Sequence, residues 1–203
     1  MMKYLILLLA LLTLTLLFAC NGNDILGGGD GVPAVGTVGS KITEQDAESQ
    51  HFNLTTPRFE MQVAIRNDVG ENSDDILNLL DEKAADFLQC QFGDPQVGSK
   101  EFQIPSGETV PPLSALRVFV VPFTFKCDAE DKDTCAGIFF SDSDIIIIAQ
   151  TSLGRCGDLP LFEHELGHRY GMAPDHSNIS EFQSCIQPPG CMFNDLINVG
   201  VGG

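Results

Sequence analysis

Three histidines and two glutamates stand close together in the stretch EHELGHRYGMAPDH, residues 163–176. His164 and His168 are four residues apart, so on a helix both imidazoles project from one face, within reach of one metal ion. Glu165 follows the first histidine and is rotated around the helix, so it lies beside such an ion without binding it. Its carboxylate can there take a proton from a metal-activated water. The spacing therefore predicts a hydrolytic metal site, and imidazole ligands favour zinc.

The residues that follow the motif add detail. Gly171 falls three residues after His168, where a helix can stop in a left-handed turn and the chain can return toward the metal. Met192 stands in a turn rich in Pro and Gly, PPGCMF. HELGHRYG, a downstream ligand and a methionine turn together resemble the metzincin clan of zinc metallopeptidases. The resemblance implies a zinc-dependent endopeptidase in which His164 and His168 bind zinc, Glu165 is the general base and Met192 lies under the metal.

One position departs from the metzincin pattern. The third ligand of that clan falls at Pro174 in this chain, and proline has no ligating atom. A loop absorbs an extra residue at little cost, so His176 becomes the expected third ligand. Asp175 stays an alternative, because some metzincins with a Leu-Pro-Asp-His sequence use the aspartate, and Ala-Pro-Asp-His is similar. Imidazole is the commoner zinc ligand, which favours His176.

Two other interpretations of the motif stay open. The first is a non-catalytic surface lipoprotein or adhesin on a metzincin-like scaffold, with or without bound zinc. The second is a gluzincin-type peptidase, whose third ligand is a downstream glutamate, and Glu181 is the sole glutamate after the motif. Peptide cleavage that stops when a chelator removes the metal would distinguish an enzyme from a scaffold.

Two helices are expected. The first has Ser73 as its cap, acidic residues in its first turn, and an apolar face formed by residues 76, 80, 84, 87 and 88. Gly93 and Pro95 end it. The second helix, at about 159–170, carries the motif.

Four segments predict strands. Residues 59–66 alternate apolar and polar side chains, and LRVFVVPF at 116–123 is largely apolar, so a βαβ crossover through the first helix should connect them. AGIFFS at 136–141 precedes DIIIIAQ at 144–150, whose four consecutive isoleucines indicate a central strand. The predicted fold class is α+β: a mixed twisted sheet with one backing helix and one active-site helix, then an irregular C-terminal subdomain. This order of elements matches the metzincin N-terminal subdomain, in which an edge strand equivalent to 136–141 holds the peptide.

The N-terminal segment MMKYLILLLALLTLTLLFAC is typical of a secretory signal, with Lys3 before an apolar run too short for a good spanning helix. Its end resembles the lipobox of bacterial lipoproteins, which implies acylation of Cys20; an ordinary signal cut near Ala19 is the alternative. We therefore expect an exported protein that is lipid-anchored to a bacterial membrane, on its periplasmic face or the cell surface. The predicted organisation is a signal peptide at 1–19, the lipidated cysteine and a glycine-rich tether at 20–54, a metzincin-like peptidase domain at 55–198 and a loose tail at 199–203.

Cysteine use and charge agree with export. The candidate disulfide cysteines are Cys90, Cys127, Cys135, Cys156, Cys185 and Cys191. Short loops separate Cys127 from Cys135 and Cys185 from Cys191, which favours local pairs. The formal net charge of −17 argues against nucleic acid or an anionic membrane surface as a partner. The expected partners are a peptide or protein substrate and a membrane reached through the lipid, and the chain is expected to be monomeric.

Overall fold

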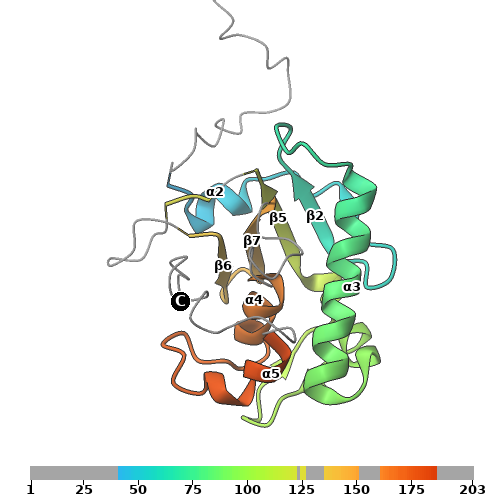
Figure 1. Cartoon of the computed structure of the whole chain (residues 1–203), viewed down its shortest axis with the longest axis vertical. Helices are drawn as coiled ribbons and strands as arrows, with labels where there is room; N and C mark the ends of the chain where they lie inside the picture. Colours follow the sequence, from blue (N-terminus) through green and yellow to red (C-terminus); the bar gives the residue numbers. More distant parts are fainter. Residues whose placement is uncertain (1–40, 123, 127–134, 151–160, 187–203) are drawn as a thin grey trace, which may run out of the picture. The chain divides into compact units, whose positions relative to one another are not determined.

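The computed structural model describes residues 41–122, 124–126, 135–150 and 161–186. All of these residues belong to one compact unit, Pro33–Gly203. They form an α+β structure with a mixed five-stranded sheet and few helices, which confirms the predicted fold class at this level (Figure 1). The predicted signal peptide, Cys20 and the predicted tail lie outside the described residues. Among the described residues, no helix has both the length and the apolar character needed to cross a membrane.

The sheet has the strand order β1-β2-β5-β7-β6. Its strands are β1 (Leu54–Thr55), β2 (Gln62–Ile65), β5 (Arg117–Val121), β6 (Gly137–Phe140) and β7 (Ile145–Ala149). β2, β5 and β7 are parallel to one another, whereas β1 pairs antiparallel with β2 and β6 pairs antiparallel with β7. A parallel centre with an antiparallel strand on each side makes the sheet mixed, as predicted.

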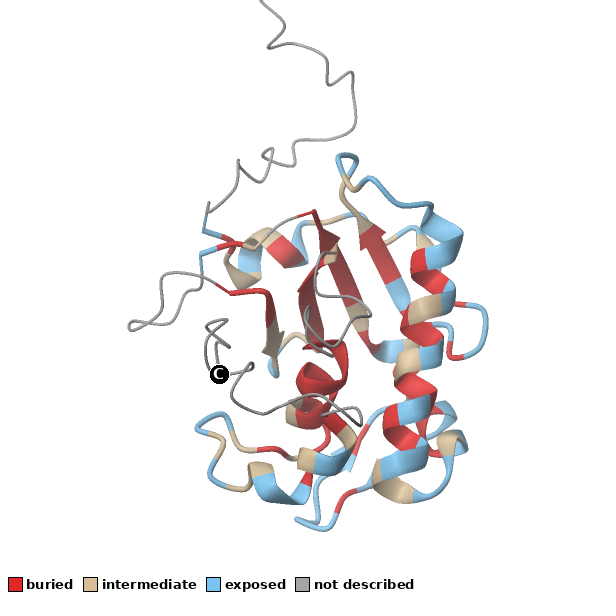
Figure 2. Ribbon diagram, in the orientation of Figure 1, coloured by how far each residue is buried: buried red, intermediate tan, exposed pale blue. Residues whose placement is uncertain are grey.

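The isoleucine-rich strand β7 lies inside the sheet, as its sequence predicts. It pairs with β5 on one side and with β6 on the other, and all five of its residues are buried. Within the described part of the chain, β6 pairs in the sheet with β7 alone. The last three residues of β6 are only half-buried, so this strand forms an edge (Figure 2).

Helix α3 (Ser73–Phe92) lies between the parallel strands β2 and β5 in the chain, which is the predicted crossover. Gly93 ends it with a φ of 73°, in the left-handed region that glycine adopts without steric cost. The predicted cap is wrong by one residue, because Asn72 and not Ser73 accepts the hydrogen bond from the backbone N–H of Asp74. Asparagine and serine cap helices about equally well, so composition alone does not choose between neighbours.

The first long strand is shorter than its alternating pattern predicts. Only Gln62–Ile65 belong to the strand, whereas the pattern extends over 59–66. Glu60 has a φ of 57°, so the chain turns immediately before the strand. Phe59 and Met61 are nevertheless buried, so the alternation of burial continues where the backbone is not extended.

The folded domain begins earlier than predicted. The predicted tether extends to residue 54, but Ile42 and Ala47 are buried in the core. Between them, Thr43 and Asp46 form a capping box at the start of helix α2 (Glu44–Glu48). The remaining short elements are η1 (Pro95–Ser99), β3 (Phe102–Gln103), β4 (Thr109–Val110), η2 (Leu113–Ala115), η4 (Ile179–Glu181) and α5 (Gln183–Ile186).

Helix α4 (Leu161–Arg169) carries the histidine motif, and residues 159 and 160 of the predicted helix lie outside the described residues. The helix contacts α3, α5, β6 and β7. Every residue of α4 except His168 is buried, so the helix is enclosed on nearly all sides (Figure 2). A helix held in this way presents its polar side chains at fixed positions.

Candidate metal centre

The two histidines of α4 lie on one face of the helix, as their spacing predicts. Their Nε2 atoms are 3.2 Å apart, and the rings meet edge to face. His164 is buried and His168 is half-buried. The helix therefore directs two imidazole nitrogens to one point.

The chain reverses direction directly after α4. Gly171 has a φ of 106°, a positive value that glycine adopts without steric cost. Asn178 fixes the loop that follows: its Oδ1 accepts the backbone N–H of Ala173 at 2.7 Å, and its Nδ2 donates to the carbonyl of Gly171 at 3.0 Å. These two hydrogen bonds hold the segment after the helix in a loop that turns back toward α4.

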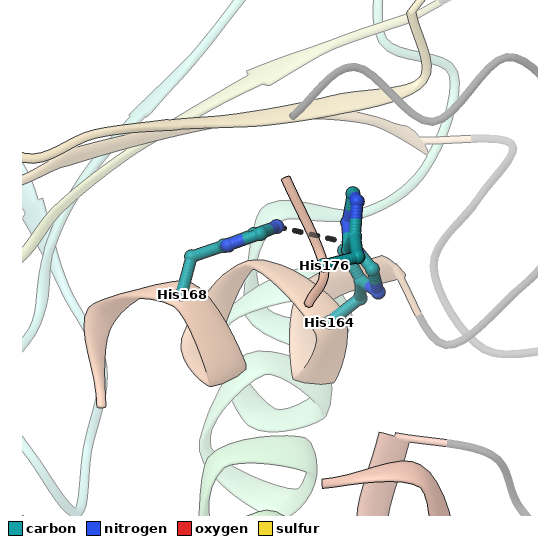
Figure 3. Close-up of side chains that lie close together, drawn as sticks. All are labelled: His164, His168 and His176. Carbon is teal, nitrogen blue, oxygen red and sulfur yellow. Dashed lines mark hydrogen bonds between the residues drawn. The ribbon is translucent and has the colours of Figure 1, made fainter. Parts of the chain in front are cut away.

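This loop brings His176 to the other two histidines. Its Nε2 lies 3.0 Å from Nε2 of His164, and one ligand atom from each of the three histidines lies within 4.8 Å of the others. Figure 3 shows the three rings pointing toward one another. His176 has a φ of 59°, so the backbone adopts a left-handed conformation to aim this ring.

The two rival ligands lie elsewhere. Asp175 is exposed, and its carboxylate accepts the backbone N–H of Ser177 at 3.0 Å. The hydrogen bonds of the carboxylate with Ser177, first with its side chain and then with its backbone, lower the pKa of Asp175. Glu181 is exposed in η4 and is likewise not part of the histidine group. The structure therefore groups His176, and not Asp175 or Glu181, with the motif histidines.

The three histidines fit a zinc ion. A tetrahedral ion with Zn–N bonds of about 2.0–2.1 Å holds its ligand nitrogens roughly 3.3 Å apart. The two measured Nε2–Nε2 distances, 3.0 and 3.2 Å, are close to that separation. One Nε2–H on His164 can point at only one neighbouring nitrogen, whereas a cation accepts the lone pairs of all three.

His168 is prepared for metal binding by its surroundings. Its Nδ1 lies 3.1 Å from the carbonyl oxygen of Met172. A carbonyl only accepts, so Nδ1 donates the hydrogen and the lone pair lies on Nε2, toward the other histidines. Burial lowers the pKa of His168 to about 4 against the opposing effect of this hydrogen bond, so the ring is neutral near pH 7.

Glu165 lies between the histidine helix and the sheet. Its side chain is fully buried, and its carboxylate lies against the backbone of Gly137 in β6. Glu163, two residues earlier, is buried beside Lys83 of α3, whose Nζ lies 3.3 Å from its Oε1. Burial raises the pKa of Glu163, and the ammonium group opposes that rise. The two glutamates of the motif thus differ in position: one is paired with α3 and the other faces β6.

An ion pair between a buried arginine and a half-buried aspartate holds the C-terminal end of α4. The Arg169 guanidinium donates to both carboxylate oxygens of Asp144, at 2.7 and 2.8 Å, and to the carbonyl oxygens of Pro111 and Pro112. Asp144 lies in the turn between β6 and β7, so the pair links the motif helix to the edge hairpin. Sequence reasoning missed this pair, because neither residue belongs to a motif that indicates a partner.

The disulfides correct one predicted pairing. Cys185 is bonded to Cys90, with a Cα–Cα distance of 5.5 Å, so the suggested local pair with Cys191 is wrong. The bond joins α3 to α5, a separation of 95 residues that loop length does not suggest. Cys135 is also disulfide-bonded. Cys127, Cys156, Cys191 and Met192 lie outside the described residues.

No family model, no curated protein and no solved structure matches this chain. The function of the site is therefore inferred from its own residues and their geometry.

Proposed function

We propose that the protein is a zinc-dependent endopeptidase of metzincin type, with His164, His168 and His176 as zinc ligands and Glu165 as general base. The observation that carries the proposal is the convergence of three imidazole nitrogens within 4.8 Å, with a buried carboxylate on the residue next to the first of them. When bound, zinc acts as a Lewis acid that lowers the pKa of water and polarises a carbonyl group.

Glu165 supplies the proton transfer in this proposal. Because it follows His164 by one residue, it leaves the helix at a different angle and is not one of the three grouped side chains. Its carboxylate takes a proton from the attacking water and passes that proton to the departing amine. The buried setting excludes bulk water, which strengthens electrostatic interactions at the site.

The edge strand β6 supports a peptide as the substrate. The Ala149 N–H donates to the carbonyl of Ala136 at 2.7 Å. In an antiparallel pair only every second residue directs its backbone N–H and C=O groups at the partner strand, and here that series starts at Ala136. Gly137 and Phe139 therefore direct their backbone N–H and C=O groups away from β7. An extended peptide can pair with these groups as an added strand, and Gly137 lies beside Glu165.

Activity and metal binding should respond differently to the loss of the base. Glu165→Gln should retain about one zinc per chain, but peptide cleavage should fall by about 10²-fold or more, the usual effect of removing a positioned base. The assay combines zinc analysis with cleavage of a quenched fluorescent peptide mixture, and a chelator followed by added zinc serves as the control. If the wild-type chain holds zinc but cleaves neither peptides nor unfolded proteins, the non-catalytic scaffold replaces the peptidase.

We also propose that the chain is exported and lipid-anchored through Cys20. The signal-like segment before Cys20 supports this, and so does the Cys90–Cys185 bond, because disulfides persist in oxidising compartments. Cys20→Ser should prevent acylation and move the protein from the detergent-rich phase to the aqueous phase. An unchanged partition would contradict the anchor.

A further inference from the structure

Gly137 of the edge strand β6 lies beside the proposed base. A Cβ atom added at this glycine would lie 2.7 Å from Oε1 of Glu165, and 3.2 and 3.3 Å from its Cγ and Cδ. Atoms that are not bonded pack best at about 3.5–4.0 Å, so a methyl group does not fit beside the carboxylate in its present place.

Space, and not backbone conformation, requires glycine at this position. Gly137 starts the strand β6 and is not among the residues with positive φ, so any L-amino acid can adopt its backbone conformation. Glycine weakens a strand, because it packs nothing and loses more conformational freedom on folding. A strand glycine of this kind often marks a close approach by another group, which here is the Glu165 side chain.

We infer that Gly137 is a positioning residue for Glu165: the missing side chain leaves room for the carboxylate to lie between α4 and β6. The inference rests on the proposed role of Glu165 as base. The atoms that a methyl group would meet belong to the far end of the Glu165 side chain. Gly137→Ala should therefore displace the carboxylate more than it disturbs the fold.

Steady-state kinetics of the zinc-loaded chain test the effect on the base. Gly137→Ala should lower kcat on the order of 10²-fold, the effect of a small misplacement of a catalytic group. The KM and the zinc content should change little, because the histidines and the edge backbone groups of residue 137 remain. A fully active Gly137→Ala enzyme would overturn the inference.

Two other glycines serve as matched controls. Gly70 has no atom within 4 Å of an added Cβ, so Gly70→Ala should change neither kcat nor Tm. An added Cβ at Gly98 meets Cδ1 of Leu88 at 2.6 Å and Cδ1 of Leu113 at 2.8 Å, which are core side chains, and none of the three atoms nearest to it belongs to Glu165. Gly98→Ala should therefore lower Tm by about 3–8 °C and leave kcat per folded molecule unchanged. A loss of kcat in both controls would mean that any added methyl group impairs the enzyme.

A thermal double-mutant cycle tests the contact without any need for activity. In the wild-type background Gly137→Ala should lower Tm, because the carboxylate must move away from its packed position. In the Glu165→Ala background the opposing atoms are gone, so the same substitution should raise Tm by about 1–3 °C through the strand preference for alanine over glycine. If Gly137→Ala alone fails to fold, the double variant should still fold.

The two experiments separate the inference from the proposed function. An equal change of Tm in both backgrounds, or failure of both variants to fold, would mean that Glu165 is not the group that requires glycine. The outcome is different if Gly137→Ala changes Tm unequally in the two backgrounds but the wild-type chain cleaves no peptide. The contact between Gly137 and Glu165 would then exist, but the proposed peptidase function would be refuted.

Discussion

Replacement of His176 tests the third ligand of the proposed zinc site. Structural zinc sites with four ligands bind with about 10–16 kcal/mol, so one ligand contributes about 2.5–4 kcal/mol. His176 provides one of the three nitrogens that lie within 4.8 Å of one another. Its loss should therefore weaken zinc binding by about 10²–10³-fold.

The choice of substituent decides what is measured. His176 has a φ of 59°, a conformation that alanine disfavours, so His176→Ala removes the ring and also strains the loop. Asparagine tolerates this left-handed conformation, so His176→Asn removes the imidazole and keeps the backbone preference. Asp175→Ala is the matched control: it removes an exposed carboxylate that accepts the Ser177 N–H, and zinc affinity should fall by less than about tenfold.

Competition with a chromophoric zinc chelator near pH 7 gives the affinities of the three variants relative to the wild type. The expected order is wild type, then Asp175→Ala, then His176→Asn, with His176→Ala equal to or below His176→Asn. If Asp175→Ala strips the metal and His176→Asn retains it, the aspartate is the ligand and the loop binds one residue earlier. If all three variants lose the same zinc affinity, the conformation of the loop determines zinc binding, and the imidazole does not.

Three further predictions concern a disulfide, an ion pair and the protonation of one site histidine. Replacing both Cys90 and Cys185 with serine should lower the free energy of unfolding by about 2–5 kcal/mol in urea titrations, because the bond closes a long loop; an unchanged midpoint would contradict this. Arg169→Met should lower the free energy of unfolding by about 1–3 kcal/mol, because it leaves the half-buried carboxylate of Asp144 without its partner, and the added substitution Asp144→Asn should restore part of the loss. In the metal-free protein, stability should fall as the pH decreases from about 6.5 to 4, because the pKa of His168 is lowered to about 4 and the unfolded chain takes up its proton first; His168→Gln should flatten this dependence in urea titrations.

Local periodicity accounts for the elements that the sequence predicts correctly. The helix ended by Gly93, the buried strand β7 and the helical spacing of His164 and His168 each depend on residues within a few positions of one another. Grouping His176 with the motif needs one more step, the turn at Gly171, and that signal is also local. Short-range patterns therefore suffice to predict most of the histidine site.

Contacts between distant segments could not be predicted in the same way. Cys185 has a nearby cysteine in the sequence, yet it bonds to Cys90, because α5 packs against α3 in the folded chain. In the sequence, Gly137 indicates only the start of a strand, and its contact with Glu165 is evident only in the folded chain. Helix α2 is missed for another reason: its five residues include one buried side chain, Ala47, which is too few to show a period.

The Cys90–Cys185 bond turns the middle of the chain into a covalent ring. The strands β5, β6 and β7, helix α4 and all three histidines lie between these two cysteines in the sequence. A single backbone cut inside the ring, for example in the exposed β3–β4 turn around Gly107, opens it without releasing a fragment. On a denaturing gel, a preparation that has cut itself once inside the ring would therefore run as one chain without reductant. After a reductant is added, it would run as two fragments. The fragment that carries the three site histidines would meanwhile stay bonded to the fragment that carries α3.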